Sequence, residues 1–428
     1  MRAYYCLLAP LVTLPAQAQD CGLLPIAAAT QLSLESAQAR GRVCHPDLRA
    51  AFGALAAAGA DLITSGQSPN PQLTVGAGSV GSDVGIGRLW NKTFDHSLRI
   101  DQIIERGGKP ALRRAIAEAQ REAARSDLAE AQRRAALAIA QGYYELAATL
   151  AKRAETAGAL ELAGEAQKAQ DLRVKTGDVA PIEATRLNLD AIRVQADLRQ
   201  AEADSHTSRV LLATMLGAEA QAGLLTPSDS WAVANQSSLD PPTLDELASK
   251  RRPDVIAAQW RLEGAQGSRE LARALRTRDV NVGVQLDRWP VSATNSSGTG
   301  NTISVSVSVP LFVRHAYEGE AARAEADVAN AVETLRRAKL TAGSDLMQAR
   351  MRVTVATARR QLADQDLMPA AERVAAAAEL AYRRGAISLL EVLDARRSLR
   401  AARIERINAQ ADAAKAAAEL DAASSALP

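Results

Sequence analysis

Four segments of this chain alternate apolar and polar residues, which is the pattern of a β-strand with one apolar and one polar face. In the fourth segment, Ile303, Val305 and Val307 are separated by serines. Branched apolar side chains on one face and hydroxyls on the other suit a strand that separates lipid from water. Each segment has about ten residues, the length that crosses a bilayer at a tilt. The predicted strands cover about residues 72–80, 93–104, 279–288 and 302–312.

The other long segments have apolar residues at three- and four-residue spacing in alanine-rich sequence, which predicts helices. Long helices are expected over 110–173 and 317–383, the second one bent at Pro369. The first would be roughly 100 Å long at about 1.5 Å per residue. Gly177 and Gly385 are expected to form turns, after which a return helix runs back along each long helix.

The two halves of the chain repeat one plan, because short motifs return at a constant distance. The Pro-Asp pair at Pro46 returns at Pro253, 207 residues later, and Glu183 returns as Glu391, 208 residues later. A solenoid unit would have about 20–50 residues, so this spacing marks a duplicated half-molecule. The predicted organisation is a signal peptide over 1–18, a first repeat over 19–216, a linker over 217–242 and a second repeat over 243–428.

Composition narrows the class of protein. Of the 428 residues, 47% are hydrophobic and only 3% are aromatic. Much of the hydrophobic share is alanine, which favours long, thin, closely packed helices over a thick globular core. The net charge is +2, from 51 basic and 49 acidic residues interleaved along the helices. This pattern is typical of solvated helix faces, so no nucleic-acid partner is expected.

The N-terminus has the features of an export signal. A basic residue precedes an apolar run over 4–14, and Ala16-Gln17-Ala18 fits a cleavage site, with a buried first helix as the alternative. Removal of the signal would leave Cys21 and Cys44. An even pair of cysteines in an exported protein favours a disulfide between them. Lipidation of Cys21 is the other interpretation, although Asp20 before it fits a lipoprotein cleavage site badly.

Four membrane strands in one chain cannot close a barrel alone. An open sheet edge in lipid would leave backbone groups unpaired, at several kcal/mol each. Three copies would supply twelve strands, enough for a barrel that holds water, whereas two would supply eight, which side chains tend to fill. The sequence therefore predicts a homotrimer that closes a β-barrel in a lipid bilayer and continues as helices in the periplasm.

Three segments have motifs of a known family: 304–312 (SVSVSVPLF), 384–399 (RGAISLLEVLDARRSL) and 176–187 (TGDVAPIEATRL). Through these motifs the chain resembles the TolC-like outer-membrane efflux proteins. The order of predicted elements extends the match over the whole mature chain. In addition, the segment 104–109 (IERGGK) is similar to the branch that serves heavy-metal cation pumps.

The resemblance implies a passive trimeric duct in the outer membrane of a Gram-negative bacterium, with a long periplasmic extension. Its partners would be a periplasmic adaptor (membrane fusion) protein and an inner-membrane pump, most often of the proton-driven RND type. The similarity to the heavy-metal branch implies metal cations as substrates. A duct of this kind would hold no cofactor and would catalyse no reaction.

The resemblance also assigns a gate. Glu391 and Asp394 match acids that ring the closed periplasmic entrance in the family, and Tyr382 matches a gate position. Three copies would bring like carboxylates together, which would attract cations and make the constriction sensitive to pH. In the alternative interpretation, Glu391 and Asp394 are first-turn acids that favour a helix N-terminus.

The latch beside this gate departs from the family pattern. A basic residue that helps to close the entrance in the family falls at Ile387. The repeat equivalents of the two gate acids are Glu183 and Arg186, and Arg186 is expected to supply the missing positive charge. Gly177 and Gly385 are expected to be structural turns first and adaptor-docking points second.

No other chemistry is indicated by the sequence. The four histidines have no ligand spacing, and no phosphate loop, Ser-His-Asp order or paired acid–base motif occurs. No catalytic residue, cofactor or metal site is therefore predicted. Two alternatives to an efflux duct stay open. One is an outer-membrane conduit of a type I protein secretion system, and the other is a periplasmic coiled-coil scaffold with a small soluble β domain.

Overall fold

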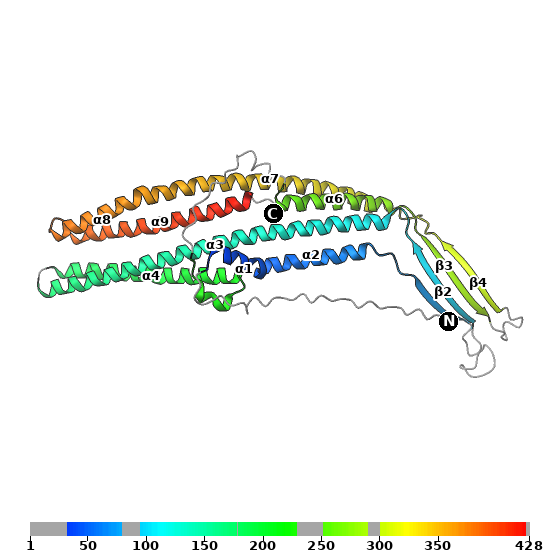
Figure 1. The fold of residues 1–428 in the computed structure, drawn as a ribbon, viewed down its shortest axis with the longest axis horizontal. Helices are drawn as coiled ribbons and strands as arrows, with labels where there is room; N and C mark the ends of the chain where they lie inside the picture. Colours follow the sequence, from blue (N-terminus) through cyan, green and yellow to red (C-terminus); the bar gives the residue numbers. More distant parts are fainter. Residues whose placement is uncertain (1–31, 79–94, 178, 229–250, 290–299, 425–428) are drawn as a thin grey trace, which may run out of the picture. The chain divides into compact units, whose positions relative to one another are not determined.

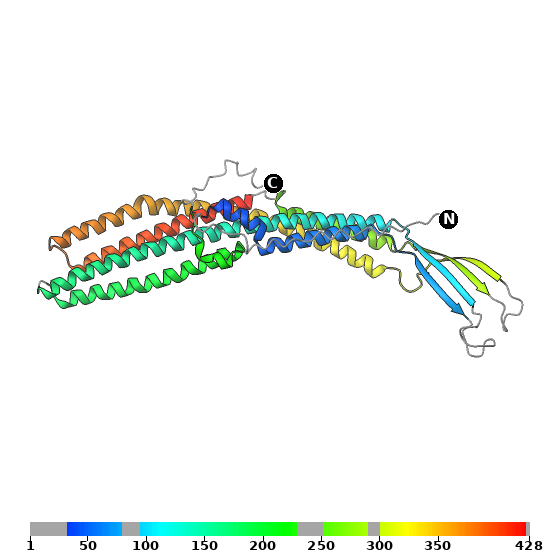
Figure 2. The same cartoon turned by 60° about the horizontal axis from the view of Figure 1, so that its bottom comes forward.

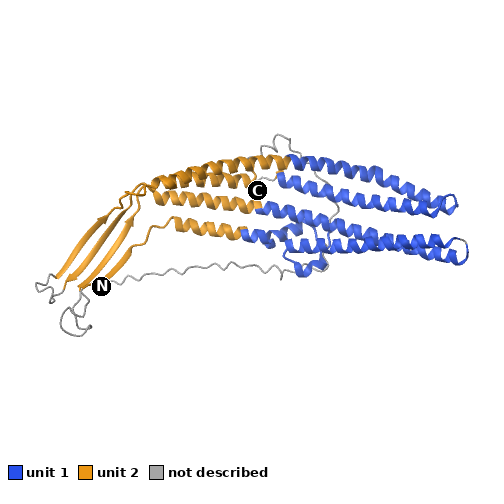
Figure 3. Ribbon diagram, turned by 180° about the vertical axis from the view of Figure 1, so that it is seen from behind, with its two compact units in different colours: residues 1–50, 131–238, 347–423 blue, residues 51–130, 239–346, 424–428 orange. Residues whose placement is uncertain are grey.

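The computed structural model describes residues 32–78, 95–177, 179–228, 251–289 and 300–424. They belong to two compact units, which Figure 3 distinguishes by colour. We call residues 51–130, 239–346 and 424–428 the strand unit. We call residues 1–50, 131–238 and 347–423 the hairpin unit.

The strand unit contains one antiparallel sheet with the strand order β1-β2-β3-β4, drawn side by side in Figures 1 and 2. The pairing of β2 with β3 joins the first half of the chain to the second half. This sheet, together with the long helices, confirms the predicted fold class, a mainly helical chain with a small β part of four strands. The strands are β1 (Gln72–Gly78), β2 (Asp95–Ile104), β3 (Val280–Trp289) and β4 (Gly300–Ser308).

The register of the sheet places its apolar residues in common rows. Because directly paired residues lie on the same face, the alternation in each strand produces one apolar face and one polar face. The exposed fractions of the side chains in one apolar row lie between 43% and 74%. This row contains Val75, Leu98, Leu286 and Ile303. The next row, on the polar face, contains Gly76, Ser97, Asp287 and Thr302.

The last strand is shorter than the alternation predicted. β4 ends at Ser308 and does not continue to residue 312. Pro310 follows two residues later and has no N–H to donate to a neighbouring strand, which explains why pairing stops there. The predicted strand residues 79–80 and 93–94 lie outside the described residues.

The helices of the hairpin unit form two helical hairpins (Figure 1). The first hairpin consists of the C-terminal part of α3 (Lys109–Lys175) and of α4 (Pro181–Met215). The second consists of α8 (Met368–Arg383) and α9 (Leu389–Ser424). Alanines fill much of their contact surfaces. Within the hairpin unit, twelve buried residues of α3 and α9 are alanines, whose small volume allows close approach.

The predicted bend at Pro369 corresponds to a change of helix type. The regular helix α7 (Glu318–Leu362) passes into a π-helical turn, Ala363–Leu367, before α8 begins. A proline inside a helix lacks the N–H for the ladder and clashes with the preceding turn. The wider π turn directly before Pro369 relieves this conflict.

The shorter helices precede these long elements in each half. Ser33 caps the first of them, since its Oγ accepts the Ser36 N–H at 3.1 Å. They are α1 (Leu34–Cys44), α2 (Pro46–Ser65), the 3₁₀ segment Glu219–Leu224 and α6 (Pro253–Ala274). In the part of the chain that the structure describes, no helix has the length and apolar character needed to cross a membrane.

A core of the hairpin unit surrounds Tyr143, which is almost completely buried. Its hydroxyl donates to the Leu32 carbonyl at 2.9 Å and accepts the Ser228 N–H at 3.2 Å. Leu32 also forms a parallel bridge with Pro227. These contacts attach the segment before α1 to the helices, an arrangement that the sequence did not predict.

Candidate functional site

The two helix turns adopt the backbone conformation that their glycines allow. Gly177 has φ +81° and Gly385 has φ +72°, in the left-handed region that other residues rarely adopt. The Gly177 N–H donates to Val174 O at 3.1 Å, and the Gly385 N–H donates to Tyr382 O at 2.9 Å. A Cβ at either glycine would meet no atom within 4 Å. Both glycines are therefore required for the chain reversal, and their surroundings are open.

Glu391, one of the two predicted gate acids, contacts the start of its own helix. Its Oε2 accepts the Ser388 N–H at 2.9 Å. Serine followed three residues later by glutamate, with this bond, forms half of a capping box. The structure therefore supports the alternative interpretation of Glu391 as a first-turn acid, and its place in a gate stays a prediction.

Asp394 and Arg186, the other predicted charges of the gate, are both exposed. Among the residues that the structure describes, neither forms an ion pair with the other or with a third residue. The predicted role of Arg186 in place of the altered latch at Ile387 therefore stays a prediction. A role of these two charges in a constriction requires other copies of the chain.

Tyr382 and Glu183 make contacts between helices at the level of the turns. The Tyr382 hydroxyl accepts from Arg173 Nη1 at 3.2 Å, which links the second hairpin to the first. Tyr382 also packs against a small apolar cluster that includes Leu389. Glu183 accepts from Gln170 Nε2 at 2.9 Å, so this bond connects α3 and α4 within the first hairpin.

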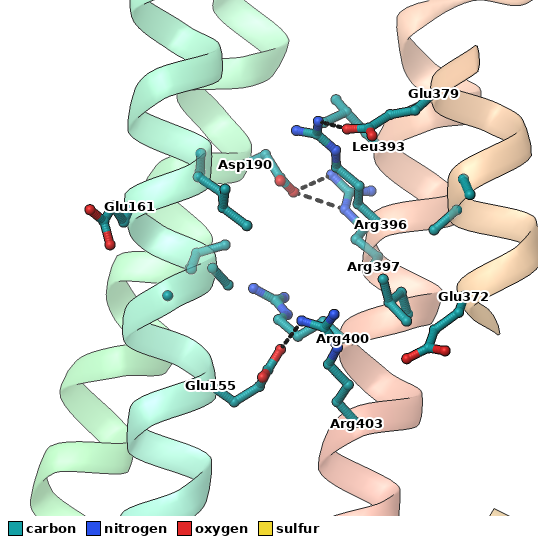
Figure 4. A pocket seen from close by; sticks show the side chains of 18 of the residues that line it. Glu155, Glu161, Asp190, Glu372, Glu379, Leu393, Arg396, Arg397, Arg400 and Arg403 are labelled. Atoms are coloured by element: carbon teal, nitrogen blue, oxygen red, sulfur yellow. Dashed lines mark hydrogen bonds and ion pairs between the residues drawn. The ribbon is translucent and has the colours of Figure 1, made fainter. Parts of the chain in front are cut away.

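A row of arginines on α9 connects the second hairpin to the first (Figure 4). Arg397 contacts Asp190 at 2.7 Å, Arg400 contacts Asp197 at 3.2 Å, and Arg403 contacts Glu155 at 2.9 Å. A neighbouring arginine, Arg396, pairs within the second hairpin with Glu379. The row borders a cavity of about 710 Å³ between the two hairpins.

This arginine row was not predicted from the sequence. Arg397, Arg400 and Arg403 recur every three residues, so they share one helix face. That spacing was the available signal, but it did not reveal the acids, which come from two other helices. Because all three arginines have carboxylate partners, the cavity offers no free cluster of positive charge for an anion.

The IERGGK motif forms the junction between β2 and α3. Arg113 Nη1 and Nη2 contact the two Glu105 oxygens at 2.5 and 2.8 Å. Lys109, whose side chain is 6% exposed, donates from Nζ to both Asp279 oxygens at 2.8 and 2.9 Å. Gly107 has φ +77°, and a Cβ there would lie 2.9 Å from Thr277 Cβ. The motif therefore has a structural role where strand becomes helix.

Two carboxylates of this junction have lowered pKa values. The hydrogen bonds from Arg113 are the largest cause for Glu105 and outweigh the effect of burial, so its pKa is lowered. For Asp279, burial alone would raise the pKa, but the Lys109 and Arg106 hydrogen bonds and the nearby positive charge together lower it. Both groups therefore favour the folded state in their charged form.

The polar face of the sheet has an ionic network of its own. Arg99 and Asp101 form a two-bond pair at 2.7 and 2.8 Å. Arg99 also reaches Ser306 Oγ at 3.3 Å, and Asn281 donates to Asp101 at 3.2 Å. A Cβ at Gly283 would lie 2.6 Å from both Asp101 and Ser306, so glycine leaves room for the network. Charged, amide and hydroxyl side chains lie on this face, in contrast to the apolar face.

The described part of the chain contains a disulfide-bonded cysteine but no cluster of metal-ligating side chains. Over those residues, no group of three or more His, Cys, Asp or Glu side chains is placed to hold a metal ion. Cys44 is buried and disulfide-bonded. Cys21 lies outside the described residues, so its pairing with Cys44 stays a prediction.

The sheet and the hairpins together define a class of protein. A four-stranded sheet with an exposed apolar face and a charged opposite face has the chemistry of a barrel wall in an outer membrane. Helical hairpins tens of residues long, with alanine-lined contacts, are the other component. The chain therefore has the features of an outer-membrane channel with a helical extension.

Comparisons with known proteins identify the family. The outer membrane efflux protein family matches residues 36–218 and again residues 244–425. The cobalt-zinc-cadmium resistance protein CzcC of Cupriavidus metallidurans is 25% identical over 402 residues, which cover 93% of this chain and 91% of CzcC.

Solved structures share the fold. A membrane protein from Pseudomonas aeruginosa has a TM-score of 0.77 at 17% identity, over 92% of this chain and 90% of that chain. The outer-membrane channel OprN has a TM-score of 0.75 at 22% identity, over 91% and 89%.

This chain belongs to the outer membrane efflux protein family, since the family match covers most of its length. It is an outer-membrane efflux channel with a helical extension in the periplasm, and it is not an enzyme. Membership of the family implies a trimer that acts in tripartite efflux. The predicted channel, its location and its lack of enzymatic activity are thereby confirmed.

Proposed function

We propose that three copies of this chain close one twelve-stranded β-barrel and carry substrate passively to the exterior. The observation that supports this most directly is the exposed apolar face of the sheet, where Val75 and Ile303 are both 74% exposed. Among the described strands, β1 and β4 each pair on one side only. Because unpaired strand edges are costly in lipid, sister subunits would pair with both edges.

The partners follow from the passive nature of the duct. A periplasmic adaptor would dock at the helix turns of Gly177 and Gly385, and an inner-membrane pump of the RND type would supply the energy. Heavy-metal cations are the proposed substrate class. The 25% identity with a protein named for cobalt, zinc and cadmium resistance supports this class, as does the IERGGK segment.

The proposed constriction lies at the turns and involves all three copies. Asp394 and Glu391 would supply carboxylates to it, and Tyr382, Glu183 and Arg186 would surround them. Threefold repetition of exposed acids would attract cations. The exposure of Asp394 and the short loop around Gly385 support this location.

Purification and bilayer recording test the proposal. The mature chain in detergent is expected to have the mass of three copies and to form stable conducting pores in a planar bilayer. A water-soluble monomer that needs no detergent would contradict the proposal and would support the scaffold alternative. Deletion of the gene separates the remaining uses. Increased metal sensitivity is expected for efflux, whereas loss of a secreted polypeptide would indicate type I secretion.

A further inference from the structure

The duplication allows the contacts between copies to be inferred from the contacts within one chain. The turn glycines Gly177 and Gly385 are 208 residues apart, so positions on the two hairpins correspond at that offset. Inside the chain, the α9 face of the second hairpin is covered by the first hairpin. In a closed ring the equivalent face of the first hairpin, on α4, needs a second hairpin from another copy.

Three ion pairs cross the contact within the chain, beside an apolar cluster near the turns that includes Leu187, Leu389 and Leu393. Arg397, Arg400 and Arg403 all line the cavity of about 710 Å³, and each contacts a carboxylate of the first hairpin. We call this contact the intrachain seam. On its opposite side, Ala159 lines the same cavity, and Ala166 packs on the apolar cluster near the turns.

The equivalent positions on α4 have a different chemistry. The residues 208 positions before Arg397 and Arg400 are Leu189 and Ile192. Their side chains are 49% and 54% exposed, and both belong to the large apolar residues that the chain leaves in contact with solvent. Two arginines of the intrachain seam thus correspond to two exposed branched apolar residues.

The equivalent positions on the other side of the seam are apolar as well. The residues 208 positions after Ala159 and Ala166 are Leu367 and Val374. Leu367 is 39% exposed and Val374 is 56% exposed. They are seven residues apart near one helix face, at the end of the π-helical turn and in α8. Larger apolar side chains therefore replace alanines at both positions.

We infer that Leu189 and Ile192 of one copy pack against Leu367 and Val374 of a second copy. We call this contact the interchain seam. The inference rests on the proposed trimer. Around the ring, intrachain and interchain seams would alternate, and the two kinds would differ in the polarity of their contacts. Ion pairs contribute to the seam within one chain, whereas the seam between copies is apolar at the equivalent positions.

The two chemistries respond differently to salt. The ion pairs of the intrachain seam are partly exposed and are screened by concentrated salt. The interchain seam loses apolar surface to water when it forms, and salt does not screen that contribution. The contact between copies is therefore expected to persist at salt concentrations that weaken the ion pairs within each copy.

Cysteine pairs test the assignment in the full-length protein. Ile192→Cys with Leu367→Cys in one chain is expected to produce dimers and trimers, linked by disulfides, on non-reducing gels. The matched control is the pair at the equivalent positions, Arg400→Cys with Ala159→Cys. That pair is expected to cross-link within the chain and to migrate at monomer mass. Reduction should return both variants to monomers.

Two results would overturn the inference. One is a monomer-mass product from the first cysteine pair in a sample whose trimer mass is confirmed in detergent. The other is a covalent ladder from the control pair. Pore formation in a planar bilayer is recorded for both variants. If the variants form pores but cross-link in the wrong pattern, the interchain seam is wrong while the proposed channel stands.

Discussion

Removal of the buried Lys109 side chain provides a quantitative prediction. Its Nζ makes two contacts with Asp279 and donates to the Thr277 carbonyl at 2.9 Å. In Lys109→Met, Asp279 keeps only the Arg106 N–H, at 2.9 Å. Breaking a buried ion pair by removing one partner costs about 3–5 kcal/mol. Because the Asp279 side chain is 31% exposed, solvent screening reduces the expected loss of local stability to about 2–3 kcal/mol.

Hydrogen exchange measures this loss where it occurs. For a loss of this size, amides over residues 105–113 of the trimer should exchange about 30 to 150 times faster in Lys109→Met. The double variant with Asp279→Asn should recover much of the protection, since it removes the unpaired charge. Exchange within twofold of the unchanged protein would refute the claim that the ion pair holds the strand–helix junction together.

Three further predictions follow from the same contacts. Glu105 and Asp279 have lowered pKa values, so their carboxylates stabilise the folded junction above their ordinary pKa values of 4.5 and 3.8. This stabilisation should be lost as the pH falls below those values, and hydrogen exchange at the junction can follow the loss. Arg252 is 2% exposed and is hydrogen-bonded to two carboxylates. The substitution Arg252→Met should therefore lower the free energy of unfolding by about 2–4 kcal/mol. Thermal unfolding measures this loss, and an unchanged melting temperature would contradict it. Glu391→Gln with Asp394→Asn should weaken cation block of single-channel current, and unchanged block would argue against a constriction lined by these acids.

The sequence was informative wherever a local pattern, such as apolar residues at every second position, determines the structure. Alternation identified all four strands, because a strand with one face in lipid must repeat every two residues. The turn glycines were identified because chain reversal there requires positive φ. The predicted end of β4 was wrong, because the alternation continues through Val309 whereas the strand ends at Ser308, before Pro310.

Contacts between distant elements could not be predicted in the same way. The acids that meet Arg397 and Arg403 come from two different helices, so no local spacing reveals them. The IERGGK segment was identified by similarity alone, and only the structure explains it, through Lys109 and Gly107 at the junction. The buried hydroxyl of Tyr143 likewise depends on a chain segment more than a hundred residues away.

One face of the sheet is expected to lie in lipid while the other faces water. Single cysteines at positions 304, 305, 306 and 307 can carry an environment-sensitive dye in the reconstituted trimer, with the disulfide at Cys44 left intact. Dyes at Val305 and Val307 should be quenched by lipid-borne quenchers, and dyes at Ser304 and Ser306 by aqueous ones. Equal aqueous quenching at all four positions would contradict the account.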